Sequence, residues 1–245
     1  MTVVKLNIDG VEYTCSPTIP STGLLLVPAG ITPVIHKLDA LAGWTGVHDA
    51  ATPGTASGGT TFPVDMGGRN ARLFSMSYTQ NGGMRFHCPY GQDTASKHFV
   101  YAGDLFIDGP QPIAQMELDN NQVTADGKTY IFGAQQNVND LAWDVSSAVL
   151  GKSKWNPTAM AANPKTWPVG EWMHFEIFSE RDDAGNITYR AIHWNGKTMA
   201  LNLKYTGALP LGWKVGVELV NCQINGYGAA GSIKVYGSNF QIAKW

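Results

Sequence analysis

The sequence predicts an all-β fold in which two antiparallel sheets pack face to face as a jelly roll. Short runs of alternating apolar and polar residues recur about every 8–12 residues, the spacing typical of β-sandwiches. Windows with the apolar spacing of a capped helix are nearly absent. The 28 glycines and 13 prolines are scattered without a period, as many turns require. A single closed barrel would show more even hairpin spacing.

The first expected element is a hairpin over residues 4–15, where Asp9-Gly10 is a strong turn signal. Residues 17–23 are interpreted as a linker. Residues 1–30 are therefore expected to form an N-terminal hairpin and linker, and residues 31–245 the jelly-roll domain.

Within that domain we expect strands in the ranges 71–79, 83–91, 98–108, 112–120 and 128–137. A three-stranded meander over residues 171–203 follows, and the ranges 213–226 and 231–245 supply the closing strands. An irregular loop is expected between Leu150 and Gly170.

Composition excludes several classes of partner. Charged residues make up 15% of the chain and the formal net charge is −2, so no basic patch indicates nucleic acid or an anionic membrane. No apolar stretch approaches the roughly 18 residues of a membrane span, and no signal peptide is visible. Cys15, Cys88 and Cys222 are too few and too dispersed for a zinc site. One disulfide with a free thiol, or three buried thiols, both fit.

Two stretches resemble a known superfamily. Residues 167–196, "WPVGEWMHFEIFSERDDAGNITYRAIHWNG", resemble the back-sheet hairpin of concanavalin A-like lectins and glucanases. The Glu117-x-Asp119 strand resembles the second mark of that superfamily, and the resemblance covers most of residues 31–245. It implies a concanavalin A-like jelly roll with the Glu-x-Asp strand on the concave sheet. A further resemblance to secreted bacterial proteins supports an extracellular or secreted location.

The candidate site lies on the strand around "QMELDNN". Side chains alternate along a strand, so Met116 and Leu118 are expected to face the core. The opposite face would carry Gln115, Glu117, Asp119 and Asn121. In a jelly roll that face is the groove where saccharides lie, although a merely solvated polar face is the alternative.

This stretch lacks the acid/base residue that glycoside hydrolysis requires. The resemblance to laminarinase-like hydrolases implies Glu117 as nucleophile, Asp119 as the residue that tunes it, and a glutamate at 121 or 122 as acid/base. The sequence has Asn121 and Gln122 there, and an amide cannot exchange a proton near neutral pH. Glu176 and Glu218 could substitute, but both lie in stretches expected in the rear sheet. We therefore expect no enzyme, or else a glycoside hydrolase acting on a β-glucan-type polysaccharide.

A polysaccharide lyase is a further alternative. Lyases abstract a proton next to a uronate carboxylate with tyrosine or histidine and neutralise that carboxylate with arginine or an amide. Arg85, His87, Tyr90 and Gln115 could supply these groups. The lyase patterns R-x-E-x-R and Y-x-K-x-G-x-Y are missing from the sequence.

The sequence also offers candidate metal ligands and candidate sugar-stacking aromatic residues. No cofactor is expected apart from a structural Ca²⁺, for which Glu117, Asp119, Asn121 and either Asp140 or Asp144 could supply oxygens. Trp143, Trp155 and Trp167 lie in or beside expected loops and are candidates for a sugar-stacking platform, or alternatively loop anchors. Trp172, Trp194 and Trp213 are expected in the core.

The preferred hypothesis is a secreted, lectin-like domain that recognises a polysaccharide or oligosaccharide in a concave groove. Hydrolase, lyase and a purely structural or adhesion domain remain the alternatives. The predicted groove residues are Arg85, His87, Gln115, Glu117, Asp119 and Gln122, flanked by Trp143, Trp155 and Trp167.

Overall fold

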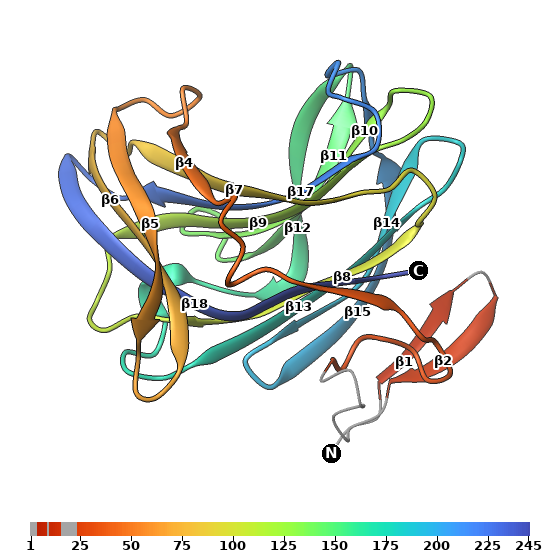
Figure 1. Cartoon of the computed structure of the whole chain (residues 1–245), viewed down its shortest axis with the longest axis horizontal. Helices are drawn as coiled ribbons and strands as arrows, with labels where there is room; N and C mark the ends of the chain where they lie inside the picture. Colours follow the sequence, from red (N-terminus) through yellow and green to blue (C-terminus); the bar gives the residue numbers. More distant parts are fainter. Residues whose placement is uncertain (1–3, 9, 16–23) are drawn as a thin grey trace.

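The computed structural model describes residues 4–8, 10–15 and 24–245. Within these residues two antiparallel sheets of eight strands each pack face to face, and a two-stranded sheet lies beside them (Figure 1). The two large sheets form a jelly-roll sandwich, which confirms the predicted fold class. Aromatic and aliphatic side chains fill the space between them, among them Phe74, Phe86, Tyr101, Phe132, Trp143, Phe175, Ile192 and Val220.

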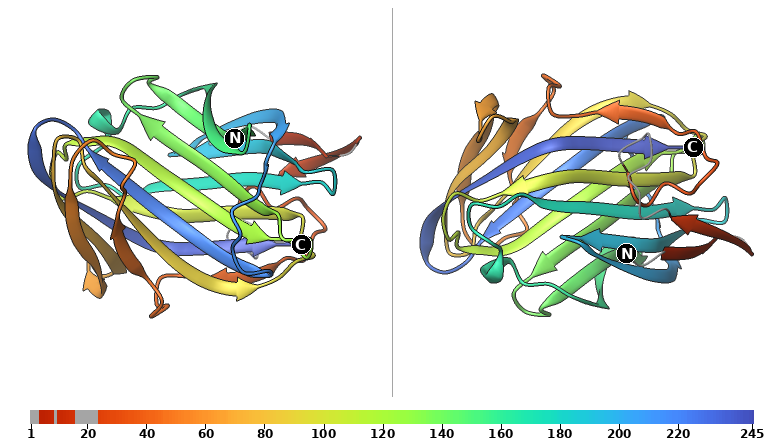
Figure 2. Two further views of the ribbon diagram at one scale, coloured as in Figure 1. Left: turned by 90° about the horizontal axis from the view of Figure 1, so that it is seen from above. Right: turned by 90° about the horizontal axis from the view of Figure 1, so that it is seen from below.

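The front sheet has the strand order β12-β11-β10-β9-β17-β7-β4, and the short β16 pairs with β10. Figure 2 shows this sheet from above. Its strands are β4 (Thr45–His48), β7 (Gly83–Gln92), β9 (Ile113–Val123), β10 (Thr129–Asn137), β11 (Ala142–Val149), β12 (Lys152–Ala161), β16 (Ala208–Leu209) and β17 (Val217–Gly226).

The rear sheet has the order β15-β14-β13-β8-β18-β6-β5, and β3 pairs with β18. Its strands are β3 (Val34–Lys37), β5 (Ala56–Asp65), β6 (Asn70–Thr79), β8 (His98–Phe106), β13 (Met173–Arg181), β14 (Asn186–Trp194), β15 (Lys197–Thr206) and β18 (Ala230–Lys244).

A 3-10 turn, η1, spans Pro164–Thr166. Within the described residues no helix is long and apolar enough to cross a bilayer.

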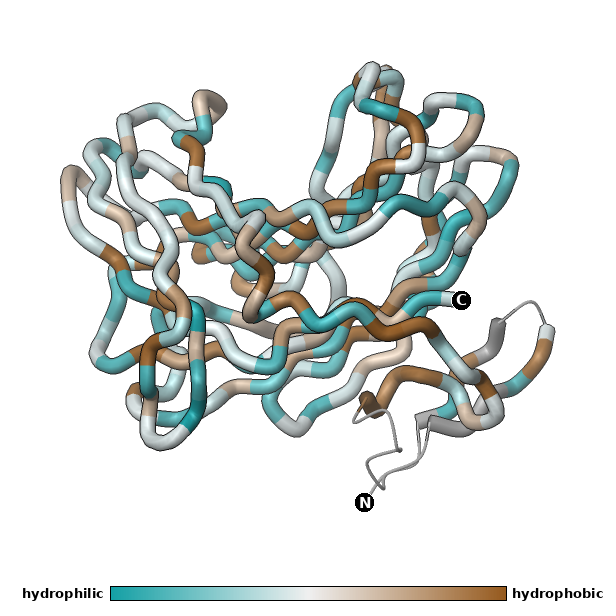
Figure 3. The backbone as a smooth tube through the Cα atoms, viewed as in Figure 1, coloured by the Kyte–Doolittle hydropathy of each residue, from teal (hydrophilic) through white to brown (hydrophobic). Residues whose placement is uncertain are grey.

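Strand β9 alternates as its sequence predicts. Met116 and Leu118 are buried between the sheets, at 1% and 0% exposure. Glu117 and Asp119 lie on the opposite face, toward a groove. Figure 3 shows the same alternation of polar and apolar residues along the front-sheet strands. The period of two therefore determines which side of the sheet is polar.

The N-terminal part contains the predicted hairpin, because β1 (Val4–Ile8) pairs antiparallel with β2 (Val11–Cys15). The predicted linker over residues 17–23 lies outside the described residues. Leu24, Leu26 and Val27 are buried against Phe178 on the outer face of the rear sheet. Residues 24–27 thus cover that face, while the predicted domain boundary at residue 31 stays a prediction.

Two expectations about the second half are wrong. The stretch from Leu150 to Gly170 is not all loop, because β12 pairs with β11 along most of its length. Sequence periodicity misses it because an edge strand such as β12 buries little: its exposure pattern is mostly open. Glu218 lies on β17 in the front sheet, not in the rear sheet, and its side chain points inward to Lys244 Nζ at 2.6 Å. Glu176 lies on β13 in the rear sheet, as predicted.

Candidate functional site

A groove of about 590 Å³ runs over the outer face of the front sheet. Its floor comes from β9, β17 and β7, and its walls from the segment after β4 and from β12 with the loop before β17. Figure 1 shows these two sides rising above the sheet. Of the predicted groove residues, the lining includes Arg85, His87, Gln115, Glu117, Asp119 and Trp155.

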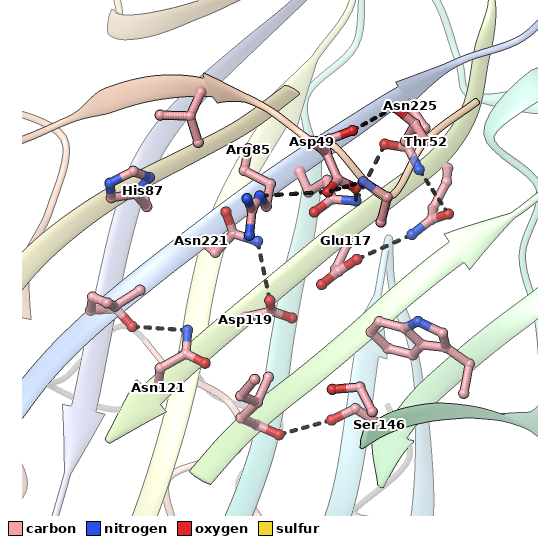
Figure 4. A pocket seen from close by; sticks show the side chains of 18 of the residues that line it. Asp49, Thr52, Arg85, His87, Glu117, Asp119, Asn121, Ser146, Asn221 and Asn225 are labelled. Atoms are coloured by element: carbon pink, nitrogen blue, oxygen red, sulfur yellow. Dashed lines mark hydrogen bonds and ion pairs between the residues drawn. The ribbon is translucent and has the colours of Figure 1, made fainter. Parts of the chain in front are cut away.

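The middle of the floor alternates carboxyl and amide groups across two strands. Strand β17 pairs with β9 so that Asn221 lies opposite Asp119 and Gln223 opposite Glu117. Asn221 Nδ2 donates to Asp119 Oδ2 at 3.1 Å, and Gln115 Nε2 donates to Glu117 Oε2 at 3.1 Å (Figure 4). Sequence reasoning missed the β17 amides, although the alternation Asn221-Cys222-Gln223 is the signal that could have found them.

Glu117 and Asp119 form a coupled acid pair. Burial, followed by the charge of Asp119, raises the pKa of Glu117 well above its usual range. Burial also raises the pKa of Asp119, while hydrogen bonds from Glu117 and Asn221 oppose that rise. Asp119 Oδ1 is buried and has no N–H or hydroxyl donor among the described residues. A proton shared between the two carboxyl groups would relieve the repulsion between them.

A third carboxyl group enters the groove from the end of β4. Asp49 accepts a hydrogen bond from Gln223 Nε2 at 3.0 Å, and Arg85 Nε lies 3.8 Å from Asp49 Oδ1. Its charge also contributes to the raised pKa of Glu117. The sequence did not single out Asp49, because nothing local links it to a strand 68 residues later.

His87 lies on β7 beside Arg85, at the other end of the floor. Its Nε2 lies 3.0 Å from Thr45 Oγ1. Desolvation, followed by the positive charge of Arg85, lowers the pKa of His87. The ring is therefore neutral at pH 7 and can accept or donate a hydrogen bond.

Two tryptophans form one wall of the groove. Trp155 stands on β12 and Trp213 in the loop before β17, where it is 37% exposed. A Cβ atom added at Gly133 would lie 3.0 Å from Trp155 Cη2 and 2.6 Å from Asp119 Oδ1. The glycine therefore leaves room for both the indole and the carboxylate. The expectation that Trp213 lies in the core is wrong, because its segment forms a loop over the sheet.

Two of the predicted tryptophans lie away from the groove. Trp143 and Trp167 are 1% and 6% exposed and belong to the core between the sheets. The side chain of Trp143 points from β11 into the core. The indole Nε1 of Trp167 donates a hydrogen bond to Gln136 Oε1 at 2.9 Å. Neither is a platform for a ligand in the groove.

Gln122 points inward as well. It is 0% exposed, and its Oε1 accepts from Arg181 Nε at 2.6 Å. Only a bulge could have turned it toward the groove, and β9 pairs with β10 in unbroken register across this stretch. The structure therefore removes Gln122 from the predicted groove residues, whereas Asn121, predicted to share the face of Glu117, lines the groove.

Cysteines and metal ligands add little to this site. Cys88 and Cys222 are free and buried, and burial raises the pKa of the Cys88 thiol to about 11. Within the described residues no group of three or more histidine, cysteine or acidic residues could hold a metal. Near Asp144 the amide of Asn137 already bonds Asp140 and Asp144, and its oxygen accepts two backbone N–H groups. This set falls short of the six to eight oxygens that Ca²⁺ prefers, so a structural Ca²⁺ stays a prediction.

No family model matches this sequence, and no curated protein matches it. Solved structures with a similar arrangement include an alginate lyase from a Chlorella virus, at 11% identity and a TM-score of 0.47, covering 76% of this chain and 89% of that one. A Bacillus licheniformis β-glucanase aligns at 11% identity and a TM-score of 0.42, over 88% and 98% of the two chains. A carbohydrate-binding module of the β-sandwich superfamily aligns at 12% identity and 0.40, over 98% and 84%. The functions of these proteins differ, and at such identities none is transferred to this chain.

Proposed function

We propose that this chain binds a polysaccharide or oligosaccharide in the concave groove. One observation carries the proposal: a floor of carboxyl and amide groups, around Glu117 and Asn221, lies beside a wall made by Trp155 and Trp213. Sugars present hydroxyl groups to polar floors and flat C–H faces to aromatic rings, so this combination matches both surfaces of a sugar ring.

Affinity electrophoresis in gels that contain soluble polysaccharides tests this proposal. We expect at least one neutral or amino-sugar polymer to retard the protein, and Gly133→Val to abolish the retardation by filling the floor beneath Trp155. Gly59→Val is the matched control, because an added Cβ at this other strand glycine meets nothing within 4 Å. Unretarded migration in every polymer, or equal retardation of wild type and Gly133→Val, would overturn the groove as the binding site.

Glycoside hydrolysis is a second candidate, favoured by the three carboxyl groups Asp49, Glu117 and Asp119 in one groove. The raised pKa of Glu117 suits a proton donor rather than the nucleophile that the sequence resemblance implies. Asp49 or Asp119 would then act as the ionised partner. Release of reducing ends that disappears in Glu117→Gln, and in either Asp49→Asn or Asp119→Asn, would favour hydrolysis over binding alone.

A lyase is less well supported by the groove. The neutral His87 suits a base, but Arg85, which would neutralise a uronate, faces Asp49 instead. We also propose an extracellular or secreted setting, since that is where most polysaccharide ligands occur. Detection of the native protein in culture medium rather than in cell extract tests this setting.

A further inference from the structure

The charges that line the groove are unequal. Its carboxyl groups are Asp49, Glu117 and Asp119, and Arg85 is the one lysine or arginine in the lining. That guanidinium lies beside an acidic group, with Nε 3.8 Å from Asp49 Oδ1. His87 adds no charge at pH 7, because desolvation and Arg85 lower its pKa. A ligand that enters the groove therefore meets a surplus of acidic groups.

One buried oxygen in this cluster lacks a donor. Asp119 is 5% exposed, and its Oδ1 has no N–H or hydroxyl partner among the described residues. Glu117 lies two residues away on the same face of β9 and is only half-buried, so it reaches the groove surface. Two adjacent carboxyl groups require either a shared proton or a cation between them. In the absence of a cation, a shared proton fulfils this need.

An ammonium group is the ligand chemistry that fits this arrangement. It carries a positive charge and three N–H donors, which match the acceptor oxygens of Glu117 and Asp119. The adjacent indole rings of Trp155 and Trp213 also favour a cation over an anion. A carboxylate ligand would instead face Asp49 and the acid pair, with Arg85 beside Asp49 as the one lysine or arginine among the described lining residues.

We propose that the groove selects glycans that carry amino groups, with glucosamine polymers as the fitting class, over neutral and uronic-acid glycans. This inference rests on the proposed function, since it names the ligand class of the same groove. The ammonium of the sugar lies against Glu117 and Asp119 and replaces the proton that they share. Glu117 ionises as the sugar binds, so binding releases this proton.

Isothermal titration calorimetry with glucosamine hexamer, N-acetylglucosamine hexamer, cellohexaose and a uronic-acid hexamer tests the proposal at mildly acidic pH and low salt. We expect the glucosamine hexamer to bind at least about tenfold more tightly than the two neutral hexamers, because one partly buried charge pair contributes on the order of a decade in Kd. Glu117→Gln should bring the ratio close to one, because the amide cannot ionise to pair with the ammonium group. Titration in two buffers of different ionisation enthalpy should show proton release in the wild type that Glu117→Gln lacks.

Glu171→Gln is the matched control, because it makes the same substitution at an exposed position outside the groove lining. An equal loss of preference in both variants would overturn the proposal in favour of non-specific attraction. Equal affinity for the amino and neutral hexamers, or tighter binding of the uronic-acid hexamer, would overturn the amino-sugar preference while the groove still binds glycans. Binding of none of the four, together with no retardation in any affinity gel, would contradict the proposed function itself.

Discussion

The outer face of each sheet carries a glutamate, and the two glutamates have opposite surroundings. On the rear sheet, Glu176 is covered by the N-terminal segment, and its two oxygens accept the backbone N–H groups of Leu25 and Leu26 at 2.7 Å each. On the front sheet, Glu117 has the Gln115 amide and the acid Asp119 as neighbours, and it opens onto a groove.

The hydrogen-bond partners of the two glutamates distinguish a structural role from a role in ligand binding. The carboxylate of Glu176 has all its hydrogen-bond partners within the chain. Besides the two backbone N–H groups, His174 Nε2 lies 3.0 Å from Glu176 Oε1. On the front sheet Glu117 and Asp119 each accept from one side-chain amide, and Asp119 Oδ1 has no donor among the described residues. This pair therefore needs a proton or a ligand. A carboxyl group that has too few hydrogen-bond donors within the fold, and that remains accessible, is the better candidate for ligand binding.

The largest expected effect comes from removing the covered carboxylate. Glu176→Ala should lower the free energy of unfolding by about 3 kcal/mol, because two charge-assisted hydrogen bonds to buried backbone groups are lost. Urea denaturation measures this change, and glycan affinity should stay the same. Glu117→Gln is the comparison, because the raised pKa of Glu117 favours its neutral form and the amide resembles that form. This variant should change the unfolding free energy by less than about 1 kcal/mol. Similar losses in both variants would contradict the contrast between the two faces.

The rear face should also make stability depend on pH at the alkaline side. Burial opposes the shift, but hydrogen bonds to Asp104 and Glu176 raise the pKa of His174 from 6.5 to about 9. A raised pKa contributes stability that is complete below pH 6.5 and is lost as the pH rises through about 9. We expect a loss of about 2 kcal/mol across this window, allowing for partial exposure of the ring. Urea titrations from neutral to alkaline pH measure it, and His174→Gln should flatten the slope.

On the groove side, Gly133→Val should weaken glycan binding more than tenfold, or about 1.4 kcal/mol. The added atoms would meet Asp119 and the Trp155 ring. Calorimetry against the tightest glycan measures the affinity, and the melting temperature of the variant monitors its folding. Unchanged affinity would show that the ligand does not reach the floor at this position.

The smallest expected effect is that of Trp213→Ala. Loss of one stacking surface should weaken binding about fivefold, with little change in stability, since the ring is partly exposed. Tyr227→Ala is the control, because that ring is 50% exposed and lies outside the groove lining. If both variants bind like the wild type, the aromatic wall makes no contact with the ligand.

Much of the candidate site was predictable where it depends on one strand. The alternation in "QMELDNN" was enough to place Glu117 and Asp119 outside and Met116 and Leu118 inside. The aromatic predictions were less successful. Trp143 and Trp167 are core residues and Trp213 is a groove residue, since whether a loop folds over a sheet or into it depends on distant partners.

Local periodicity thus determined by itself that the chain is all-β and that one face of β9 carries two carboxyl groups, because successive side chains of a strand point to opposite sides. Only the tertiary structure decided what surrounds those groups. The pairing of β17 with β9 brought Asn221 and Gln223 beside the acids, and the end of β4 brought Asp49 across from them. Strand neighbours far apart in sequence are selected by packing over the whole sheet, which no short stretch of sequence encodes.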